Sequence, residues 1–175
     1  RAWPGLALLV AIDLGVFMQH FTPEQPTEYL EVRPAVIAAL EAEPDPKRIT
    51  TVGPDFLNRL SPNTQMIFDL ESMQGSESLV FLRYQRVLSA SESERYGYPQ
   101  PDPASPLVDM LAVTHLLSVD AIDDPGWRLL GRYETRLYAN EQAAPRAFLA
   151  RAVVAHPDDE AVFAAVTAPD LDPLS

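Results

Sequence analysis

The longest uninterrupted apolar run of the chain lies near its start, where seven apolar residues at positions 6–12 precede Asp13. A run without alternation is typical of a central strand covered on both faces, and a buried helix is the alternative. We predict a buried strand. Seven residues are too few to cross a bilayer, which takes about 20 apolar residues, and the sequence after the run does not resemble a signal-peptide cleavage site.

Helical and strand-like patterns alternate through the rest of the first half. Apolar positions at helical spacing predict a helix over residues 33–43, a helix of one or two turns after Ser61-Pro62, and a longer helix over residues 75–88. A β-branched segment at residues 48–53, with prolines on both sides, predicts a second strand of the same sheet. The apolar faces of the first two helices consist of Val36, Ile37 and Leu40, and of Met66, Ile67 and Leu70.

The second half continues the alternation. Ser105 before Pro106 predicts a capped helix, which leads into a strand at residues 113–119. Residues 127–139 predict two antiparallel strands at a sheet edge, and residues 146–154 predict one more strand. Proline and acidic residues at positions 157–160 predict a last helix that ends near residue 167.

These elements predict an α/β fold. We expect a layered, mixed and mostly parallel sheet with helices packed on it and an antiparallel edge. The length of 175 residues fits one domain over residues 1–175, and an apolar fraction of 47% with 22% charged residues is ordinary for a globular protein.

Charge and residue usage exclude several classes of function. A net charge of −12 disfavours binding to nucleic acids, whose phosphates are also negative. The absence of cysteine excludes disulfides and thiolate nucleophiles. The three histidines are dispersed and no glycine-rich phosphate loop occurs, so we predict no metal site and no cofactor.

Candidate site residues are few. The acidic pairs at residues 123–124 and 158–159 suggest paired-carboxylate chemistry, but a turn and a helix start explain them more simply. His115 falls inside a predicted strand and is expected to be a core histidine. Asp13, at the end of the predicted first strand, is the best binding candidate, because α/β sheets bind ligands at the carboxyl ends of strands. Structural capping is the alternative for Asp13.

Several ordered segments carry a resemblance to a known family. They are residues 8–14 with Phe21-Thr22-Pro23, then Arg48-Ile49, Ser61-Pro62-Asn63 and Arg83-Tyr84, then residues 105–117, and finally residues 137–141 and 144–149. In this order they resemble the extracytoplasmic region of the YfhO family of bacterial multi-spanning membrane proteins, which is similar to polyprenyl-phosphate-sugar-dependent membrane glycosyltransferases. The chain departs from the family pattern at Thr114-His115 and at Gly75-Ser76.

The resemblance implies a soluble domain on the extracytoplasmic side of the bacterial cell membrane. The chain starts with Arg1, and we expect it to be a fragment of a larger membrane protein. Its partners would be the transmembrane region of that protein and a glycan or a lipid-linked sugar. The catalytic carboxylates of the family belong to loops between membrane helices, so no catalytic residue is assigned. Arg146, beside the turn at Pro145, is a candidate to pair with a carboxylate and is the second binding candidate. A structural role, in which this turn-flanking arginine satisfies carbonyls or a nearby acid, is the alternative.

Three functions remain as hypotheses. The first is a non-catalytic domain that positions a glycan or lipid-linked acceptor for a glycosyltransferase-like parent protein. The second is an autonomous carbohydrate-active hydrolase that uses Asp13 with a distant acid. The third is a protein-interaction module, although the sequence shows neither a heptad seam nor a long amphipathic helix.

Overall fold

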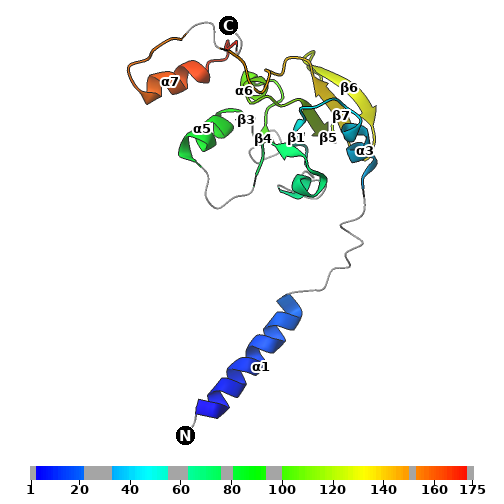
Figure 1. Ribbon diagram of the computed structural model, residues 1–175, viewed down its shortest axis with the longest axis vertical. Helices are drawn as coiled ribbons and strands as arrows, with labels where there is room; N and C mark the ends of the chain where they lie inside the picture. Colours follow the sequence, from blue (N-terminus) through cyan, green and yellow to red (C-terminus); the bar gives the residue numbers. More distant parts are fainter. Residues whose placement is uncertain are drawn as a thin grey trace. The chain divides into compact units, whose positions relative to one another are not determined.

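The computed structural model describes residues 3–21, 33–54, 63–75, 81–93, 100–149 and 153–172. The chain divides into two compact units, Arg1–Val32 and Arg33–Ser175. The first unit contains the helix α1 (Trp3–Phe21), and the second contains the sheets and the other described helices (Figure 1).

Helix α1 stands where a buried strand is predicted at residues 6–12, so the strand prediction is wrong. The apolar pattern continues beyond Asp13 through Leu14, Val16 and Phe17, and a 19-residue element is far longer than an ordinary strand of about 5–6 residues. The large apolar side chains of α1 are exposed rather than buried. Among the residues described, no helix is both long enough and apolar enough to span a membrane.

The main sheet has five strands in the order β2-β1-β5-β7-β6. Strand β1 is parallel to β2 and β5, whereas β7 is antiparallel to β5 and β6. The predicted α/β class, with a mixed sheet and an antiparallel edge, is confirmed. The strands are β1 (Arg48–Val52), β2 (Glu71–Ser72), β5 (His115–Ser118), β6 (Trp127–Arg132) and β7 (Arg136–Asn140).

Helices and a small second sheet accompany the main sheet. Strands β3 (Glu92–Ser93) and β4 (Gln100–Pro101) pair with each other in antiparallel orientation. The helices of this unit are α3 (Ala35–Glu41), the 3₁₀ helix η1 (Thr64–Phe68), α5 (Leu82–Ala90), α6 (Pro106–Met110) and α7 (Asp159–Val166).

The two faces of the main sheet carry separate apolar cores because successive side chains of a strand point to opposite faces. On one face, the predicted apolar side of α3 packs on the sheet, and on the other face α6 contributes to the core. The first core is formed by Val36, Ile37, Leu40, Ile49, Leu70, Leu117 and Leu137. The second is formed by Val52, Met73, Val108, Val113, Leu116, Trp127 and Tyr138.

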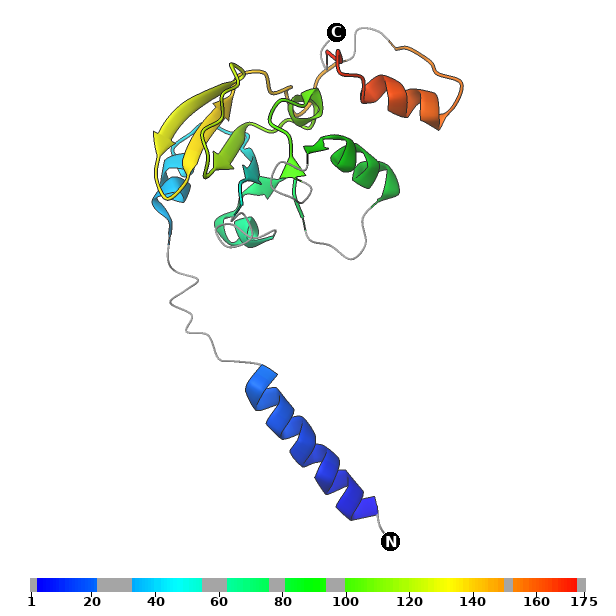
Figure 2. The same ribbon diagram turned by 180° about the vertical axis from the view of Figure 1, so that it is seen from behind.

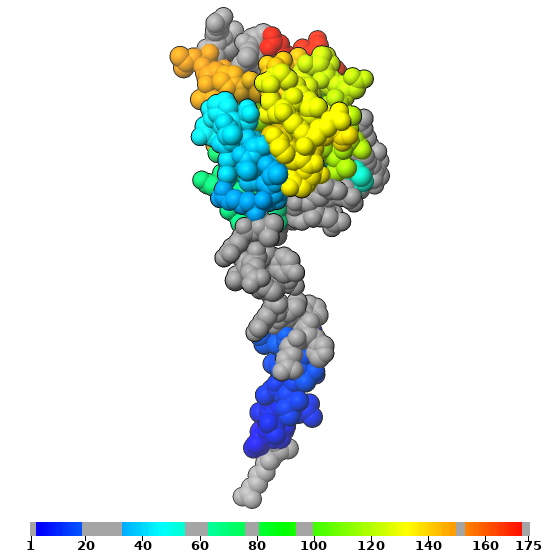
Figure 3. Space-filling view, turned by 90° about the vertical axis from the view of Figure 1, so that its right-hand side faces the viewer, coloured from blue at the N-terminus to red at the C-terminus, as the bar shows by residue number. Residues whose placement is uncertain are grey.

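Helix α3 begins against the turn that joins β6 to β7. The Glu134 carboxylate accepts hydrogen bonds from the backbone N–H groups of Ala35 (2.9 Å) and Val36 (3.1 Å), and α3 lies beside the β6–β7 hairpin on the surface (Figure 3). These hydrogen bonds lower the pKa of Glu134, with the bond from Ala35 as the largest cause. A distant carboxylate therefore caps a helix whose own N-cap residue, Pro34, has no side-chain donor or acceptor.

Replacement of Glu134 by alanine is expected to lower the free energy of unfolding by about 1 kcal/mol, the usual value of an N-cap carboxylate at an exposed position. Because the folded-state pKa is depressed, this contribution is present above the unfolded pKa and is lost as the pH falls through the folded value. Urea unfolding at pH 7 and pH 3 measures it. An equal loss at both pH values would contradict the capping role.

Helices α5 and α7 lie side by side and are joined mainly through charged groups (Figure 2). Arg83 contacts Asp159 at 2.6 Å, and Arg86 contacts Glu160 at 2.8 Å while its guanidinium lies 4.2 Å from the centre of the Phe163 ring. The ion pair with Arg86 lowers the pKa of Glu160. Neither helix has a buried side chain, so polar contacts on the surface join them.

Two predicted helices differ from expectation in detail. The helix after Ser61-Pro62 is the 3₁₀ helix η1, and of its predicted apolar face Leu70 is buried while Met66 and Ile67 are exposed. The predicted cap at residues 61–62 lies outside the described residues. Helix α5 begins only at Leu82, because the preceding Phe81 is extended, and most of its predicted first part, residues 76–80, is also outside the described residues.

The predicted cap at Ser105 is confirmed, but one predicted strand is not. The Ser105 hydroxyl accepts from Leu107 N at the start of α6, and the Asp158 carboxylate accepts from Ala161 N at the start of α7. Residues 146–149 and 153–154 are not in a strand, so the strand predicted at 146–154 is wrong for its described part. Strand pairing needs a partner from elsewhere in the chain, which local composition does not indicate.

Candidate functional site

Two glutamine side chains continue the hydrogen bonding of β1 where its short neighbour β2 ends. Gln74 accepts from Thr51 N at 2.7 Å through Oε1 and donates to Thr51 O at 3.1 Å through Nε2. Gln100 repeats this arrangement one step further along, because its Oε1 accepts from Gly53 N at 2.7 Å and its Nε2 donates to Gly53 O at 3.1 Å. Each side-chain amide therefore takes the place of a backbone peptide in the sheet.

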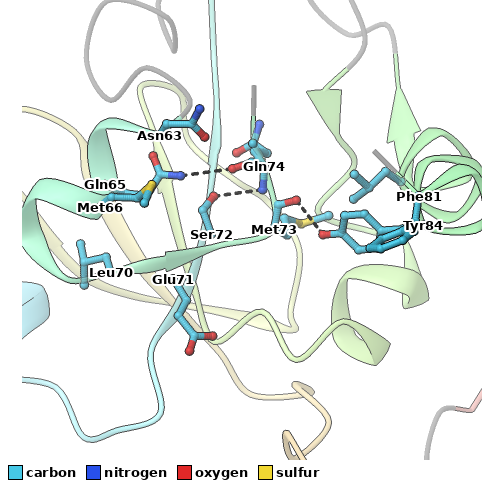
Figure 4. A pocket seen from close by; sticks show the side chains of 12 residues that line it. Asn63, Gln65, Met66, Leu70, Glu71, Ser72, Met73, Gln74, Phe81 and Tyr84 are labelled. Atoms are coloured by element: carbon cyan, nitrogen blue, oxygen red, sulfur yellow. Dashed lines mark hydrogen bonds between the residues drawn. The ribbon is translucent and has the colours of Figure 1, made fainter. Parts of the chain in front are cut away.

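An open hollow of about 530 Å³ lies at the carboxyl end of β2, between η1 and the start of α5 (Figure 4). This volume is within the usual range for a small-ligand site. The carboxyl ends of strands are also where α/β sheets bind ligands. The hollow is lined by Asn63, Gln65, Met66, Leu70, Glu71, Ser72, Met73, Gln74, Gly75, Phe81, Tyr84 and Leu88.

Hydrogen bonds between neighbouring residues fix the wall of this hollow. Gln65 donates to the Gln74 carbonyl at 3.2 Å, and the Ser72 hydroxyl accepts from Gln74 N at 3.0 Å. The Tyr84 hydroxyl donates to the Met73 carbonyl at 3.0 Å, which joins α5 to the end of β2 (Figure 4). The wall is therefore held from both sides of β2.

Apolar surface completes the hollow. Met73 is only 2% exposed and belongs to the core beneath it, whereas Phe81 is 89% exposed at the N-terminal end of α5 and Met66 is exposed on η1. An aromatic ring with this exposure has a free face toward solvent. A site with side-chain amides and one open aromatic ring has the composition expected for an uncharged, hydroxyl-rich ligand.

Glu71 lines the hollow but its carboxylate points away from the amides (Figure 4). It pairs with Arg146, and Arg48 contacts it at 3.4 Å. The hydrogen bond from Arg146 is the main cause that lowers the pKa of Glu71, against the opposing effect of burial. The predicted pairing of Arg146 with a carboxylate is therefore confirmed, and a binding role for Arg146 stays a prediction.

A second hollow of about 460 Å³ adjoins the ion pair of Arg146 and Glu71. It is lined by charged residues of both signs, and Lys47 contacts Asp45 at 3.1 Å. Four acidic and two basic side chains line it, and most of them are engaged in ion pairs within the protein, so we take this hollow as structural. Its lining is Glu41, Asp45, Pro46, Lys47, Phe68, Asp69, Leu70, Glu71 and Arg146.

The other candidates of the sequence analysis fall elsewhere. Asp13 lies in the middle of α1, not at the end of a strand, so the argument for a site there is lost, although its binding role stays a prediction. His115 is a buried core residue, as predicted. Its Nδ1 lies 2.9 Å from the Thr114 hydroxyl, and burial lowers its pKa. Asp124 accepts from Gly126 N at 2.8 Å, as predicted for a turn.

The described residues contain no group of three histidine or acidic side chains that would hold a metal ion. Two carboxyl groups have a raised pKa, Glu92 and Asp109, and burial is the main cause for both. Neither of them lines the hollow at the end of β2.

Comparison of the chain with known protein families, with curated proteins and with solved structures finds no match. The fold and the hollow define the class of the chain: an α/β domain with an open hollow at the carboxyl end of an edge strand.

Sequence patterns do not show how the residues of the hollow are used. Phe81 falls within the helix predicted at residues 75–88, but it is extended and 89% exposed instead of packing on the core. Gln74 stands outside every apolar periodicity that locates a helix or strand, and it bonds a residue 23 positions away. The role of Gln74 follows from the register of β1 against β2, which no local motif encodes.

Proposed function

We propose that the chain is a non-catalytic domain on the extracytoplasmic side of a bacterial membrane protein, where it positions a glycan or a lipid-linked acceptor for a glycosyltransferase-like parent. The observation that carries the proposal is the hollow at the end of β2. Among the described residues, its wall includes the polar side chain of Asn63, its rim offers the exposed ring of Phe81, and the carboxylate of Glu71 is turned away toward arginines.

The chemistry of sugars supports this proposal. A sugar ring presents hydroxyl groups around its edge and C–H groups on its faces, so it binds where polar groups and an aromatic face meet. Gln65 and Asn63 lie on one side of the hollow and Phe81 on the other (Figure 4). Among the described residues that line the hollow, the carboxylate of Glu71 is engaged by arginines, and these residues supply no pair of acid and nucleophile for glycosidic bond cleavage, which supports positioning rather than hydrolysis.

The surface of α1 supports a partner with apolar surface. Large apolar side chains are exposed around this helix, among them Leu8, Val10, Phe17 and Met18, and Asp13 is the one ionisable residue between Trp3 and Met18. A helix that is apolar on all sides is normally covered by other apolar groups. We propose that the transmembrane region of the parent protein supplies this cover.

Neutral sugars are expected to bind the hollow with millimolar or tighter affinity. Titration of the ¹⁵N-labelled chain with maltotriose, chitobiose and mannobiose would shift the amide resonances of Gln74 and Tyr84. Replacement of Phe81 by alanine is expected to weaken binding about tenfold, which corresponds to about 1.4 kcal/mol. Phe148→Ala, which removes an exposed ring outside the hollow, serves as the matched control and should leave the affinity unchanged.

Two results would refute the proposal. If none of these sugars shifts the resonances of the hollow, the binding role fails. If a parent protein that lacks this domain still transfers sugar at the normal rate, a required positioning role fails.

A further inference from the structure

The positive charges of the described residues are almost all neutralised by a carboxylate, with two exceptions. Arg33, Lys47, Arg48, Arg83, Arg86, Arg128 and Arg146 each form an ion pair. Within the ranges that the structure describes, Arg132 and Arg136 alone among the arginine and lysine residues form none. Two unneutralised arginines are unexpected in a chain with a net charge of −12.

These two arginines lie directly opposite each other on neighbouring strands. Arg132 ends β6 and Arg136 begins β7, and the strand register pairs them. The same register pairs Arg136 with Ser118 of β5, and Ser118 with Val52 of β1. Residues paired across strands share a face of the sheet, so the arginines and Ser118 form one row.

Buried polar atoms in this row lack hydrogen-bond partners. Ser118 is 1% exposed, and neither its hydroxyl oxygen nor the Nε of Arg136 has a partner. The hydroxyl of Thr135, next to Arg136, is buried in the same way. The guanidinium of Arg136 is nevertheless held in place, because its Nη1 donates to the Val119 carbonyl.

The opposed arginine charges and the buried polar atoms without partners are both unfavourable for the folded state. Like charges placed opposite each other across strands repel, and a buried donor without a partner costs about 1–3 kcal/mol. One bound water would satisfy the Nε and the hydroxyl but would leave both guanidinium charges unneutralised. An oxyanion accepts from all these donors and neutralises the charge as well.

The row also lies where the topology favours a ligand. The chain passes from β1 to β2 on one side and later to β5 on the other, so the strand order reverses between β1 and β5. Open α/β sheets bind ligands outside the carboxyl ends of their strands at such a reversal. Ser118 is the last residue of β5 and pairs with the last residue of β1.

We propose that Arg132, Arg136 and Ser118 bind a phosphate group, either as the free ion or as a phosphate ester. Phosphate has more acceptor oxygens and more charge than a carboxylate, which matches two guanidinium groups and a hydroxyl. The site uses none of the residues that line the hollow at the end of β2, and it does not depend on sugar binding there.

The resonances of the arginine Nε–H groups test this site in the full chain. Addition of inorganic phosphate at constant ionic strength is expected to shift the Arg136 Nε–H signal to saturation, and acetate or chloride should not do so. Glycerol phosphate tests for an ester: if it also saturates the shift, the site accepts phosphate esters as well as the free ion, and saturation by inorganic phosphate alone identifies the free ion as the ligand.

Variants complete the test. Arg132→Gln, at an exposed position, is expected to weaken phosphate binding at least tenfold. Ser118→Ala is expected to weaken it about threefold. Arg128→Gln, on the same strand as Arg132 but paired with Glu141, is the matched control and should bind normally. A shift that grows linearly without saturation, an equal response to acetate and chloride, or normal binding by Arg132→Gln would overturn the proposal.

Discussion

Replacement of Gln100 by leucine is expected to lower the free energy of unfolding by about 2–4 kcal/mol. Gln100 is 1% exposed, and its amide forms hydrogen bonds with both the N–H and the C=O of Gly53, which is itself buried. Leucine is similar in size but removes both bonds, and each buried peptide group that loses its partner costs about 1–3 kcal/mol. Urea unfolding followed by the fluorescence of the buried Trp127 measures the loss.

The exposed Gln85 on α5 provides the matched control for this substitution. Gln85→Leu changes the same atoms at the surface and should alter the free energy of unfolding by no more than about 0.5 kcal/mol. A loss below 1 kcal/mol for Gln100→Leu would show that its amide does not act as a replacement for a backbone peptide.

Asn140→Ala is expected to cost about 2–3 kcal/mol, because one side chain connects three parts of the fold. Its Nδ2 donates to the Asp109 carboxylate at 2.7 Å and to the Val113 carbonyl at 2.9 Å, and its Oδ1 accepts from Gln142 N at 2.9 Å. A hydrogen bond to a charged group is worth about 1.5–3 kcal/mol. Glu141→Ala, at the next position but in an exposed ion pair, should cost less than 1 kcal/mol.

The cost of Asn140→Ala should depend on pH. Burial raises the pKa of Asp109 above its unfolded value, so the ionised form is disfavoured in the folded state. Stability therefore falls as the pH rises from the unfolded-state pKa to the folded-state pKa of Asp109. The hydrogen bond from Asn140 favours the ionised form. Its removal should therefore cost most near neutral pH and less once Asp109 is protonated.

Urea unfolding of the unsubstituted chain and of Asn140→Ala at pH 7 and pH 4 tests this dependence. In an Asp109→Asn background the difference between the two pH values should disappear, since the titrating group is gone. A difference that persists in that background would assign the pH dependence to another residue.

The sequence predicts elements well where local chemistry decides them. The apolar face of α3 and the cap at Ser105 are found where the residue pattern places them, and α7 begins at the acidic residues that predict it. The strand predicted at residues 6–12 is wrong because the apolar stretch does not end at Asp13. Apolar residues continue beyond Asp13, and the whole stretch has the length of a helix. The strand predicted at 146–154 is wrong in its described part because composition does not reveal a pairing partner.

Sites are predicted less well because they depend on contacts between distant segments. Arg146 is correctly predicted to pair with a carboxylate, but its partner Glu71 lies 75 positions away. Gln100 and Gly53 are separated by 47 positions and carry no motif. The pairing of Arg132 with Arg136 follows from the predicted hairpin, because a hairpin that turns through residues 133–135 places these two residues opposite each other.

The glutamine amides along β1 also bear on how copies of this chain behave in concentrated solution. An unpaired strand edge invites a foreign extended segment to add to the sheet, and this is a common start of aggregation. Beyond the short strand β2, the amides of Gln74 and Gln100 already occupy the peptide groups of Thr51 and Gly53 that such a segment would need. Two side chains thus protect this edge of the sheet from self-assembly at the positions of β1 beyond its pairing with β2.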